Sequence, residues 1–375
     1  MKLLVAFLLA WGIYLLQKAV YDHLWDKGLA SDLSFEKDVL YEGEENTLIE
    51  VIENRKYLPL PILQVKFAIT RTFLFQKQEN TSVTDKYYRS DYFTVMPWQK
   101  ITRSYPFICS KRGCFFTENI DLICRPFFLE QWMVVSQPQY AGVCVLPARI
   151  DHREVSENVK KLLGETEKNL RINEDPFTFS GIRDYQPYDN MRSINWKISA
   201  RHDKLLVNTY NSTFSKKVVL LLNLETNSMV HAEQTREWAI RIASHLAGHF
   251  ISARIPTALY TNGRDVAAAE EGPGCPAIEA GADMAHIRVI EVALARLNEK
   301  ETGMPFLSLM EERIRTGKDP VEYIIISNYR KKDITGRYEA LLSEGHGVHF
   351  IIPAVLHEKE EELDLTKYIL WMRKD

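Results

Sequence analysis

The chain has 375 residues, more than one ordinary hydrophobic core holds, so its length predicts two or three domains. Hydrophobic residues make up 46% of the sequence and charged residues 26%, a balance typical of globular proteins and not of disordered ones. The formal net charge of -3 argues against a broadly basic surface, and we therefore expect no nucleic-acid partner.

The N-terminus carries an apolar run, Leu3 to Leu16, which extends to Val20 if the polar residues between them snorkel. About 14 strictly apolar residues suit a signal-peptide core, whereas about 18 suit a single membrane anchor. No A-x-A cleavage site follows, so we favour an uncleaved anchor helix over residues 1–21. A cleaved signal and an amphipathic or buried helix are the alternatives.

Residues 31–150 predict an all-β sandwich of about seven short strands separated by turn signals such as Arg112-Gly113. The strand number and spacing are typical of an immunoglobulin-like sandwich, although no Cys-Trp-Cys core pattern makes it a true immunoglobulin domain. The predicted strands are LSFEKDVLY, NTLIEVIEN, ILQVKFAITRTFLF, YFTVM, KITRSYPFICS, CFFTENIDLIC and WMVVSQ.

The five cysteines are spread along the chain with no CxxC pair and no zinc-like spacing. An odd, scattered set indicates reduced and mostly buried thiols in a cytosolic environment. A bridge from Cys109 to Cys114, or from Cys114 to Cys124, between neighbouring strands is the alternative. The remaining cysteines are Cys144 and Cys275.

Residues 154–170 predict a polar helix, and the stretch that follows, residues 181–207, is dense in charged, aromatic and turn-forming side chains. We expect turns and a short helix here. Asp189 suits its N-cap, and Ile194 and Trp196 would anchor it on the core. Arg183, Lys197 and Arg201 would then remain available to anions or carboxylates.

This stretch has the form R-D-Y-x-x-x-D-x-x-R-x-I-x-W-K-x-x-A-R and precedes an apolar strand, KKVVLLLNLE. It closely resembles the signature of the DUF58 family. The resemblance implies a membrane-anchored protein with a von Willebrand factor A-like domain, often encoded beside MoxR-type AAA+ ATPases and transglutaminase-like proteins. The family usually has two N-terminal membrane helices and a cytoplasmic body, whereas this chain shows one. The signature residues are Arg183, Asp184, Tyr185, Asp189, Arg192, Trp196, Lys197 and Arg201.

From residue 217 onwards the pattern changes to α/β, with continuous apolar strands alternating with helices. This predicts a doubly wound parallel sheet with any ligand site at the carboxyl ends of its strands. The predicted strands are VVLLLNLE, PTALYTN, EYIIISN and GVHFIIP, and the predicted helices span residues 233–253, 284–298, 305–315, 333–344 and a final one near 365.

A von Willebrand A-like domain binds a divalent cation through a D-x-S-x-S loop after its first strand. This chain has Asn223, Glu225 and Asn227 in that loop, without the leading aspartate. We expect a metal-free scaffold without a cofactor, and a degenerate magnesium site is the alternative. His245 and His249 have metal-binding spacing but no glutamate between them, so we interpret them as helix surface.

Together these features predict four segments: an anchor at 1–21, a sandwich at 31–150, the signature at 151–212 and a von Willebrand A-like domain at 213–375. We expect a single-pass protein of the cell membrane with a cytoplasmic body. Its function would be that of a scaffold or adaptor for a partner protein, with a MoxR-type ATPase as the candidate, and not that of an enzyme. The alternatives are a hydrolase using Asp184, Asp189, Lys197 and Arg201, and an outward-facing binding module.

Overall fold

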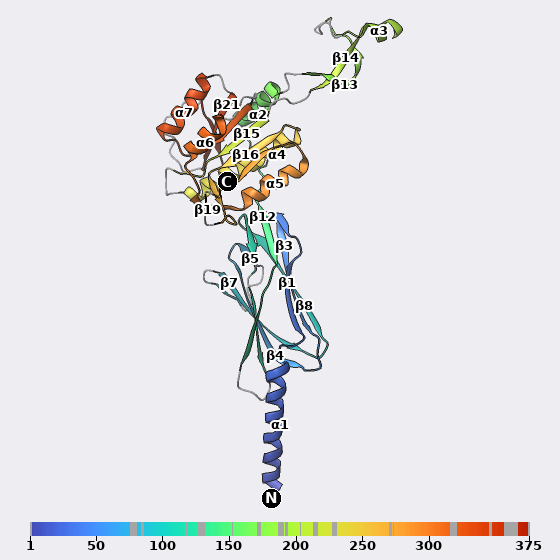
Figure 1. The fold of residues 1–375 in the computed structure, drawn as a ribbon, viewed down its shortest axis with the longest axis vertical. Helices are drawn as coiled ribbons and strands as arrows, with labels where there is room; N and C mark the ends of the chain where they lie inside the picture. Colours follow the sequence, from blue (N-terminus) through green and yellow to red (C-terminus); the bar gives the residue numbers. More distant parts are fainter. Residues whose placement is uncertain are drawn as a thin grey trace. The chain divides into compact units, whose positions relative to one another are not determined.

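The computed structural model describes residues 2–75, 81–83, 86–117, 119–126, 132–151, 153–170, 174–186, 191, 194–202, 204–212, 217–226, 231–269, 272, 274–315, 321–344, 347–355 and 367–373. The chain forms two compact units, Met1–Ala148 and Arg149–Asp375 (Figure 1). The four-segment division given above stays a prediction.

The first helix, α1 (Lys2–Leu24), is long and apolar enough to cross a membrane between Leu3 and Leu24. These 22 residues have a mean hydropathy of 1.9 and expose their apolar side chains. At about 1.5 Å per residue they extend about 33 Å, which matches a hydrocarbon core of about 30 Å. The end of the helix is not exposed in this way, because Tyr21 and, just beyond the helix, Trp25 are buried in the core of the sandwich.

The predicted β-sandwich is present, built from two antiparallel sheets of strand order β1-β3-β8-β5 and β11-β10-β4-β7-β6. A third, three-stranded sheet has the order β2-β12-β9. Alternating side chains of β3, such as Leu48 and Ile52, are fully buried between the sheets. The strands are β1 (Leu29–Phe35), β2 (Val39–Tyr41), β3 (Glu45–Asn54), β4 (Leu60–Thr70), β5 (Phe73–Phe75), β6 (Thr81–Val83), β7 (Lys86–Val95), β8 (Lys100–Cys109), β9 (Gly113–Phe116), β10 (Ile120–Arg125), β11 (Met133–Gln137) and β12 (Gly142–Leu146).

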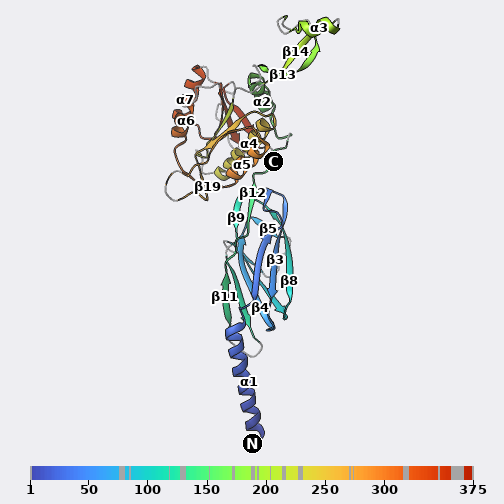
Figure 2. The ribbon, with the colours of Figure 1, turned by 45° about the vertical axis from the view of Figure 1, so that its right-hand side comes forward.

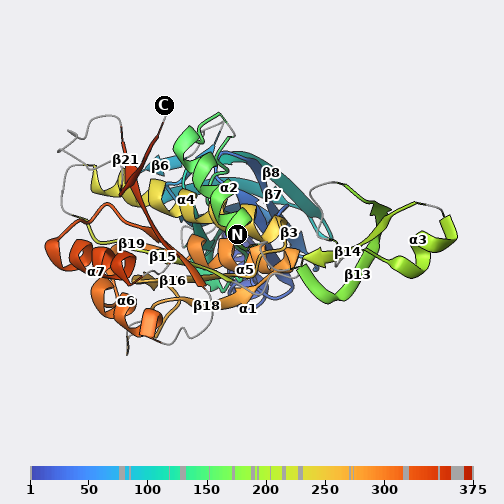
Figure 3. The ribbon, with the colours of Figure 1, turned by 90° about the horizontal axis from the view of Figure 1, so that it is seen from above.

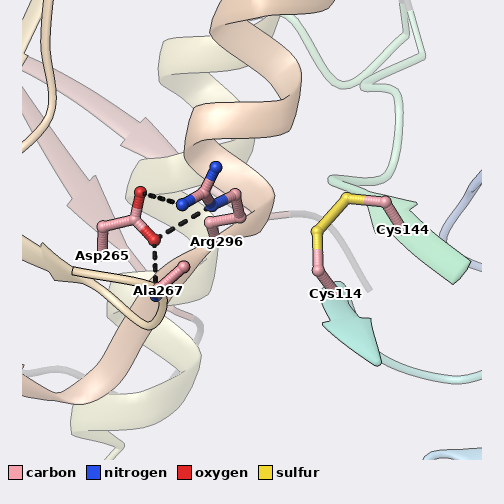
Figure 4. The surroundings of a disulfide bond; sticks show 5 residues. All are labelled: Cys114, Cys144, Asp265, Ala267 and Arg296. Carbon is pink, nitrogen blue, oxygen red and sulfur yellow. Dashed lines mark hydrogen bonds and ion pairs between the residues drawn. A yellow bond between two sulfur atoms is a disulfide. The ribbon is translucent and has the colours of Figure 1, made fainter. Parts of the chain in front are cut away.

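The prediction that the cysteines are reduced thiols is wrong for Cys114 and Cys144. Cys114 of β9 lies directly opposite Cys144 of β12, and a disulfide joins them (Figure 4). Neither of the two alternative bridges forms, because Cys109 and Cys124 are buried free thiols and Cys275 is a half-buried one. The sequence analysis missed this pair because it did not predict β12, the strand that brings Cys144 beside Cys114.

The second unit contains a six-stranded sheet of order β18-β16-β15-β20-β21-β22. Its neighbours pair in parallel, except that β18 (Ala277–Gly281) is an antiparallel edge strand. Residues of α4 and α5 pack on one face and residues of α6 and α7 on the other, as Figure 3 shows. The other elements are β15 (Lys217–Leu222), α4 (Ala232–Ser252), β16 (Thr257–Thr261), β17 (Gly263–Asp265), α5 (Met284–Ala295), β19 (Leu297–Thr302), α6 (Phe306–Arg315), β20 (Val321–Ile326), α7 (Lys332–Ser343), β21 (Gly347–Ala354) and β22 (Ile369–Met372).

The last sheet strand, β22, was not predicted, and the predicted helix near residue 365 lies outside the described residues. Trp371 of β22 is fully buried. Its indole Nε1 donates to the Glu154 carbonyl oxygen at 3.0 Å, just before α2 (Glu157–Leu170), and its own carbonyl accepts from Trp238 Nε1 of α4 at 2.8 Å. These bonds join the chain end to the helices that cover one face of the sheet.

Candidate functional site

The signature stretch forms a β-hairpin with a helix in its connection, and not only the turns and helix that we expected. Strand β13 (Glu174–Asp184) pairs antiparallel with β14 (Leu206–Ser212), so that Arg183 lies opposite Val207 and Asp184 opposite Leu206 (Figure 2). The connection contains α3 (Trp196–His202). A two-stranded hairpin buries little apolar surface, and its sequence therefore carries a weak strand signal.

The start of α3 is capped by Asn195. Asp189, which we expected to be a helix N-cap in this stretch, lies outside the described residues. Asn195 Oδ1 accepts from the Ile198 backbone N–H at 3.2 Å, as an N-cap side chain does. Its Nδ2 donates to Asn208 Oδ1 at 2.9 Å and ties the helix start to β14. Ile194 is buried beside Val207, with which it forms an isolated bridge.

The signature places an exposed aromatic residue and exposed cations on one short helix. Trp196 is 61% exposed, so the prediction that it anchors the segment on the core is wrong, whereas Ile194 is buried. Lys197 and Arg201 of α3 are also exposed. Of the other signature residues, Arg183 and Asp184 are exposed and Tyr185 is half-buried. Arg183 Nη1 donates to the Asp184 carbonyl oxygen at 3.3 Å. Asp189 and Arg192 lie outside the described residues.

A second polar cluster lies where β15, β16 and β20 end. Asn223, directly after β15, is buried, and its Nδ2 donates to Ser327 Oγ at 3.0 Å. Its Oδ1 accepts from Asn262 Nδ2 and from the Glu225 backbone N–H, each at 2.9 Å. Asn262 Oδ1 accepts in turn from the Leu224 N–H at 2.9 Å. This network joins the carboxyl ends of three strands at the point where the strand order reverses, the usual ligand position of such sheets.

Two of the three candidate metal-loop residues therefore already have protein partners. Besides the bonds of Asn223, the Glu225 carboxylate accepts from the Phe306 backbone N–H at the start of α6, at 2.9 Å. The cavity beside them, lined in part by Arg236 and Asn328, has a volume of about 10 Å³, no more than one water molecule needs. The third residue, Asn227, lies outside the described residues.

The paired histidines of α4 contact other helices and strands. His249 Nε2 lies 2.8 Å from Glu167 Oε1 of α2, and the ring of His245 packs edge-on against Trp371, with centroids 5.8 Å apart. They border a cavity of about 330 Å³ together with Lys160. Within the described part of the chain, no group of three His, Cys, Asp or Glu side chains could hold a metal ion.

Asn262 and Ser327, which complete the polar network, were not predicted from the sequence. Asn262 directly follows β16 and Ser327 directly follows β20. Their position at strand ends beside Asn223 was the available signal, because the carboxyl ends of parallel strands lie at one edge of the sheet.

Several solved structures are similar to part of this chain, at low identity and low TM-score. They include the CARDB domain of a Pyrococcus furiosus protein in complex with di-metal ions (11% identity, 32% of this chain and 90% of that chain, TM-score 0.22). A non-cellulosomal cohesin from Archaeoglobus fulgidus (7%, 31% and 91%, TM-score 0.20) and the sporulation control protein Spo0M from Bacillus subtilis (12%, 42% and 58%, TM-score 0.18) also match.

No curated protein matches the sequence. Residues 181–266 match a family model described as "Protein of unknown function DUF58". The matched residues include α3, the end of the hairpin, and both Asn223 and Asn262 of the polar network. Residues 181–266 of this chain are therefore similar to the DUF58 family model.

Proposed function

We propose that the protein is a membrane-anchored scaffold or adaptor that captures a partner protein through the DUF58 signature. The observation that carries the proposal is the exposure of Trp196 beside Lys197 on α3. Tryptophan and arginine are the residue types that most often dominate binding energy at protein interfaces. With Arg183 and Arg201 also exposed, the complementary surface would be an apolar pocket bordered by carboxylates.

The candidate partner is a MoxR-type AAA+ ATPase, as the family resemblance implies. The α/β domain would be von Willebrand A-like, because its central strand β15 is followed by the Asn223 loop in the position of the metal loop. The hydrogen bonds of Asn223 support a form of this loop that needs no cation, since amide groups already join the strand ends.

The exposure of the polar signature residues favours the scaffold over the hydrolase. Asp184, Lys197 and Arg201 are all exposed to solvent. Catalytic acids and bases usually lie in clefts that exclude water and so strengthen electrostatic interactions. Side chains on an exposed hairpin instead suit recognition of another surface.

We further propose that α1 makes the protein single-pass and that the body faces the cytoplasm, where it could meet an AAA+ ATPase. The first argument for this side, a set of reduced cysteines, no longer holds because Cys114 and Cys144 are paired. The proposal now depends on the positive-inside rule, with Lys18, Lys27 and Lys37 after the apolar run and Lys2 and the free amine before it.

The test is affinity capture of the full chain from gently solubilised membranes. Wild type should recover a MoxR-type ATPase. The double variant Trp196→Ala, Arg201→Ala should bind the ATPase at least about tenfold more weakly, since two interface anchors contribute about 1.4 kcal/mol or more of binding free energy. Met284→Ala, which removes a side chain that is 69% exposed on α5, is the matched control and should capture normally.

Equal thermal stability of the three proteins would show that the double variant is folded. Recovery of the ATPase by both the wild type and the double variant would exclude the signature as the contact. Absence of the ATPase from every sample would remove this partner from the proposal.

A further inference from the structure

The end of the sandwich that receives α1 carries exposed aromatic residues on three separate loops. Tyr57, between β3 and β4, is 83% exposed, and Trp98, between β7 and β8, is 61% exposed. Trp132 directly precedes β11, whose first residue pairs with the end of β10. Strand β10 ends at Arg125, opposite Ile62 near the start of β4, so Trp132 lies at the same end of the sandwich. Three exposed aromatic residues at one end of a domain indicate a shared apolar partner. We call Tyr57, Trp98 and Trp132 the aromatic end.

Hydrogen bonds hold two of these loops in place. Asn54 is fully buried, and its Nδ2 donates to the carbonyl oxygens of Leu58 at 2.9 Å and of Met96 at 3.0 Å. The rings of Tyr57 and Trp98 pack edge-to-face, with centroids 5.5 Å apart. The two aromatic side chains are therefore presented together by preformed loops.

Trp98 also has an unfavourable backbone conformation. Its φ of 57° lies in the left-handed region, which bulky residues rarely adopt. Such strain persists where the surrounding structure enforces it, and it is frequent at binding sites. Here the strained residue is a tryptophan whose side chain is mostly exposed.

The loop between β3 and β4, which carries Tyr57, contacts the end of the membrane helix. Tyr21 Oη, in the last turn of α1, donates to the Pro59 carbonyl oxygen at 2.8 Å. Lys56 Nζ donates to the carbonyl oxygen of Trp25, directly beyond that turn, and to that of Lys27 at 2.9 Å. Tyr57 lies between Lys56 and Pro59 and is therefore held beside the point where α1 ends.

The length of α1 places this point at the membrane surface. Its span of about 33 Å slightly exceeds a hydrocarbon core of about 30 Å, and the headgroup regions add roughly 5 to 7 Å on each side. A helix that fills the core therefore ends among the headgroups, and so does the β3–β4 loop bound to its end. Tryptophan and tyrosine are enriched at this depth, where their amphipathic rings are stable.

The charges at this end favour anionic headgroups. Among the described residues of this end, basic side chains exceed acidic ones, and Lys or Arg beside a membrane is attracted to anionic lipid. The basic residues are Lys18, Lys27, Arg55, Lys56, Lys100 and Arg125, and the acidic ones are Asp22, Asp26 and Glu53, of which Glu53 is paired with Arg55.

We propose that the aromatic end docks on the bilayer surface and fixes the sandwich against the membrane. The proposal rests on α1 crossing the bilayer, as in the proposed function. The bilayer itself is the partner, bound by aromatic insertion at headgroup depth and by attraction between basic side chains and anionic lipid.

The test uses nitroxide labels on the full chain in vesicles of phosphatidylcholine and phosphatidylglycerol. The labelled variants are Tyr57→Cys at the aromatic end, Leu9→Cys in α1 and, as the matched control, Tyr140→Cys, whose tyrosine is 91% exposed on the sandwich. Cys275→Ser is included in each, since Cys275 is the half-buried free thiol. Collisions with oxygen and with an aqueous nickel chelate are measured by electron paramagnetic resonance.

The labels at 57 and 9 should lose most collisions with the chelate, whereas the label at 140 should keep them. A label at 57 that collides like the one at 140, with position 9 protected, would overturn the docking proposal alone. An unprotected label at 9 would overturn the membrane anchor as well. Protection of position 57 only after a soluble protein is added would replace the bilayer by a protein partner.

Discussion

Among individual residues, Glu50 has the environment most sensitive to pH. It is almost completely buried in the sandwich, and its Oε2 accepts from Tyr105 Oη at 2.6 Å. Asp91, also buried, accepts from the same hydroxyl at 3.1 Å and is paired with Arg89 and Arg103. The pKa of Glu50 is raised to about 7, chiefly by burial and also by the neighbouring Asp91 charge, while the Tyr105 hydrogen bond lowers it.

This pKa predicts a stability that falls as pH rises. The unfolded chain loses the Glu50 proton near its ordinary pKa of 4.5, whereas the folded chain keeps it to about 7. Between these pH values the folded state binds more protons than the unfolded state. The free energy of unfolding therefore decreases by at most about 3 kcal/mol as the pH rises through this range. Urea unfolding at about pH 5 and about pH 8 measures the difference.

Glu50→Gln should reduce this pH dependence, because glutamine stays neutral throughout. Glu53→Gln, at an exposed ion pair on the same strand, is the control and should leave it nearly unchanged. An equal decrease in wild type and Glu50→Gln would assign the effect to other groups.

At the scale of elements, the polar network joins three strand ends with neutral groups. Asn223→Asp would introduce the aspartate that begins the cation loop of a von Willebrand A-like domain, and it would bury a charge in place of the amide that donates to Ser327. We expect the free energy of unfolding to fall by about 2 to 4 kcal/mol. Magnesium at roughly 10 mM should not restore it, because oxygen ligands around Asn223 are already used.

Chemical unfolding with and without magnesium measures both effects. Asn158→Asp makes the same substitution at an exposed position of α2 and should be nearly neutral. Recovery of Asn223→Asp stability by magnesium would show that this loop can still hold a cation.

For the whole molecule, the Cys114–Cys144 pair reports the side of the membrane on which the body lies. Glutathione and thioredoxin keep cytosolic cysteines reduced. A cytoplasmic body therefore predicts that the Cys114–Cys144 bond of the structure is reduced to two free thiols in living cells. Acid quenching followed by denaturing alkylation and peptide mass spectrometry measures this.

Cys109 and Cys124 serve as internal standards, since burial raises the pKa of each to about 12 and both are free thiols. They should be alkylated after denaturation wherever the body lies. A bonded Cys114–Cys144 pair in the same sample would place the body in an oxidising compartment.

Local sequence patterns predicted the elements whose signal is carried within a few residues. The apolar run indicated α1, and the continuous apolar segments indicated the buried strands β15 and β20. The signature motif indicated the similarity to DUF58 that the family model finds at residues 181–266. The spacing of apolar residues is enough to predict these elements, because each segment's own sequence indicates which of its side chains are buried.

Features that depend on residues distant in sequence required the tertiary structure. Strand pairing across 30 residues brings Cys114 to Cys144, and β16 and β20 bring Asn262 and Ser327 to Asn223. The sequence by itself determined where the chain is apolar, where it turns and which signature it carries. Only the tertiary structure decided that Trp196 is exposed and which partners the cysteines and amides have. The reason is that the pairing and register of strands depend on long-range contacts, which local composition does not contain.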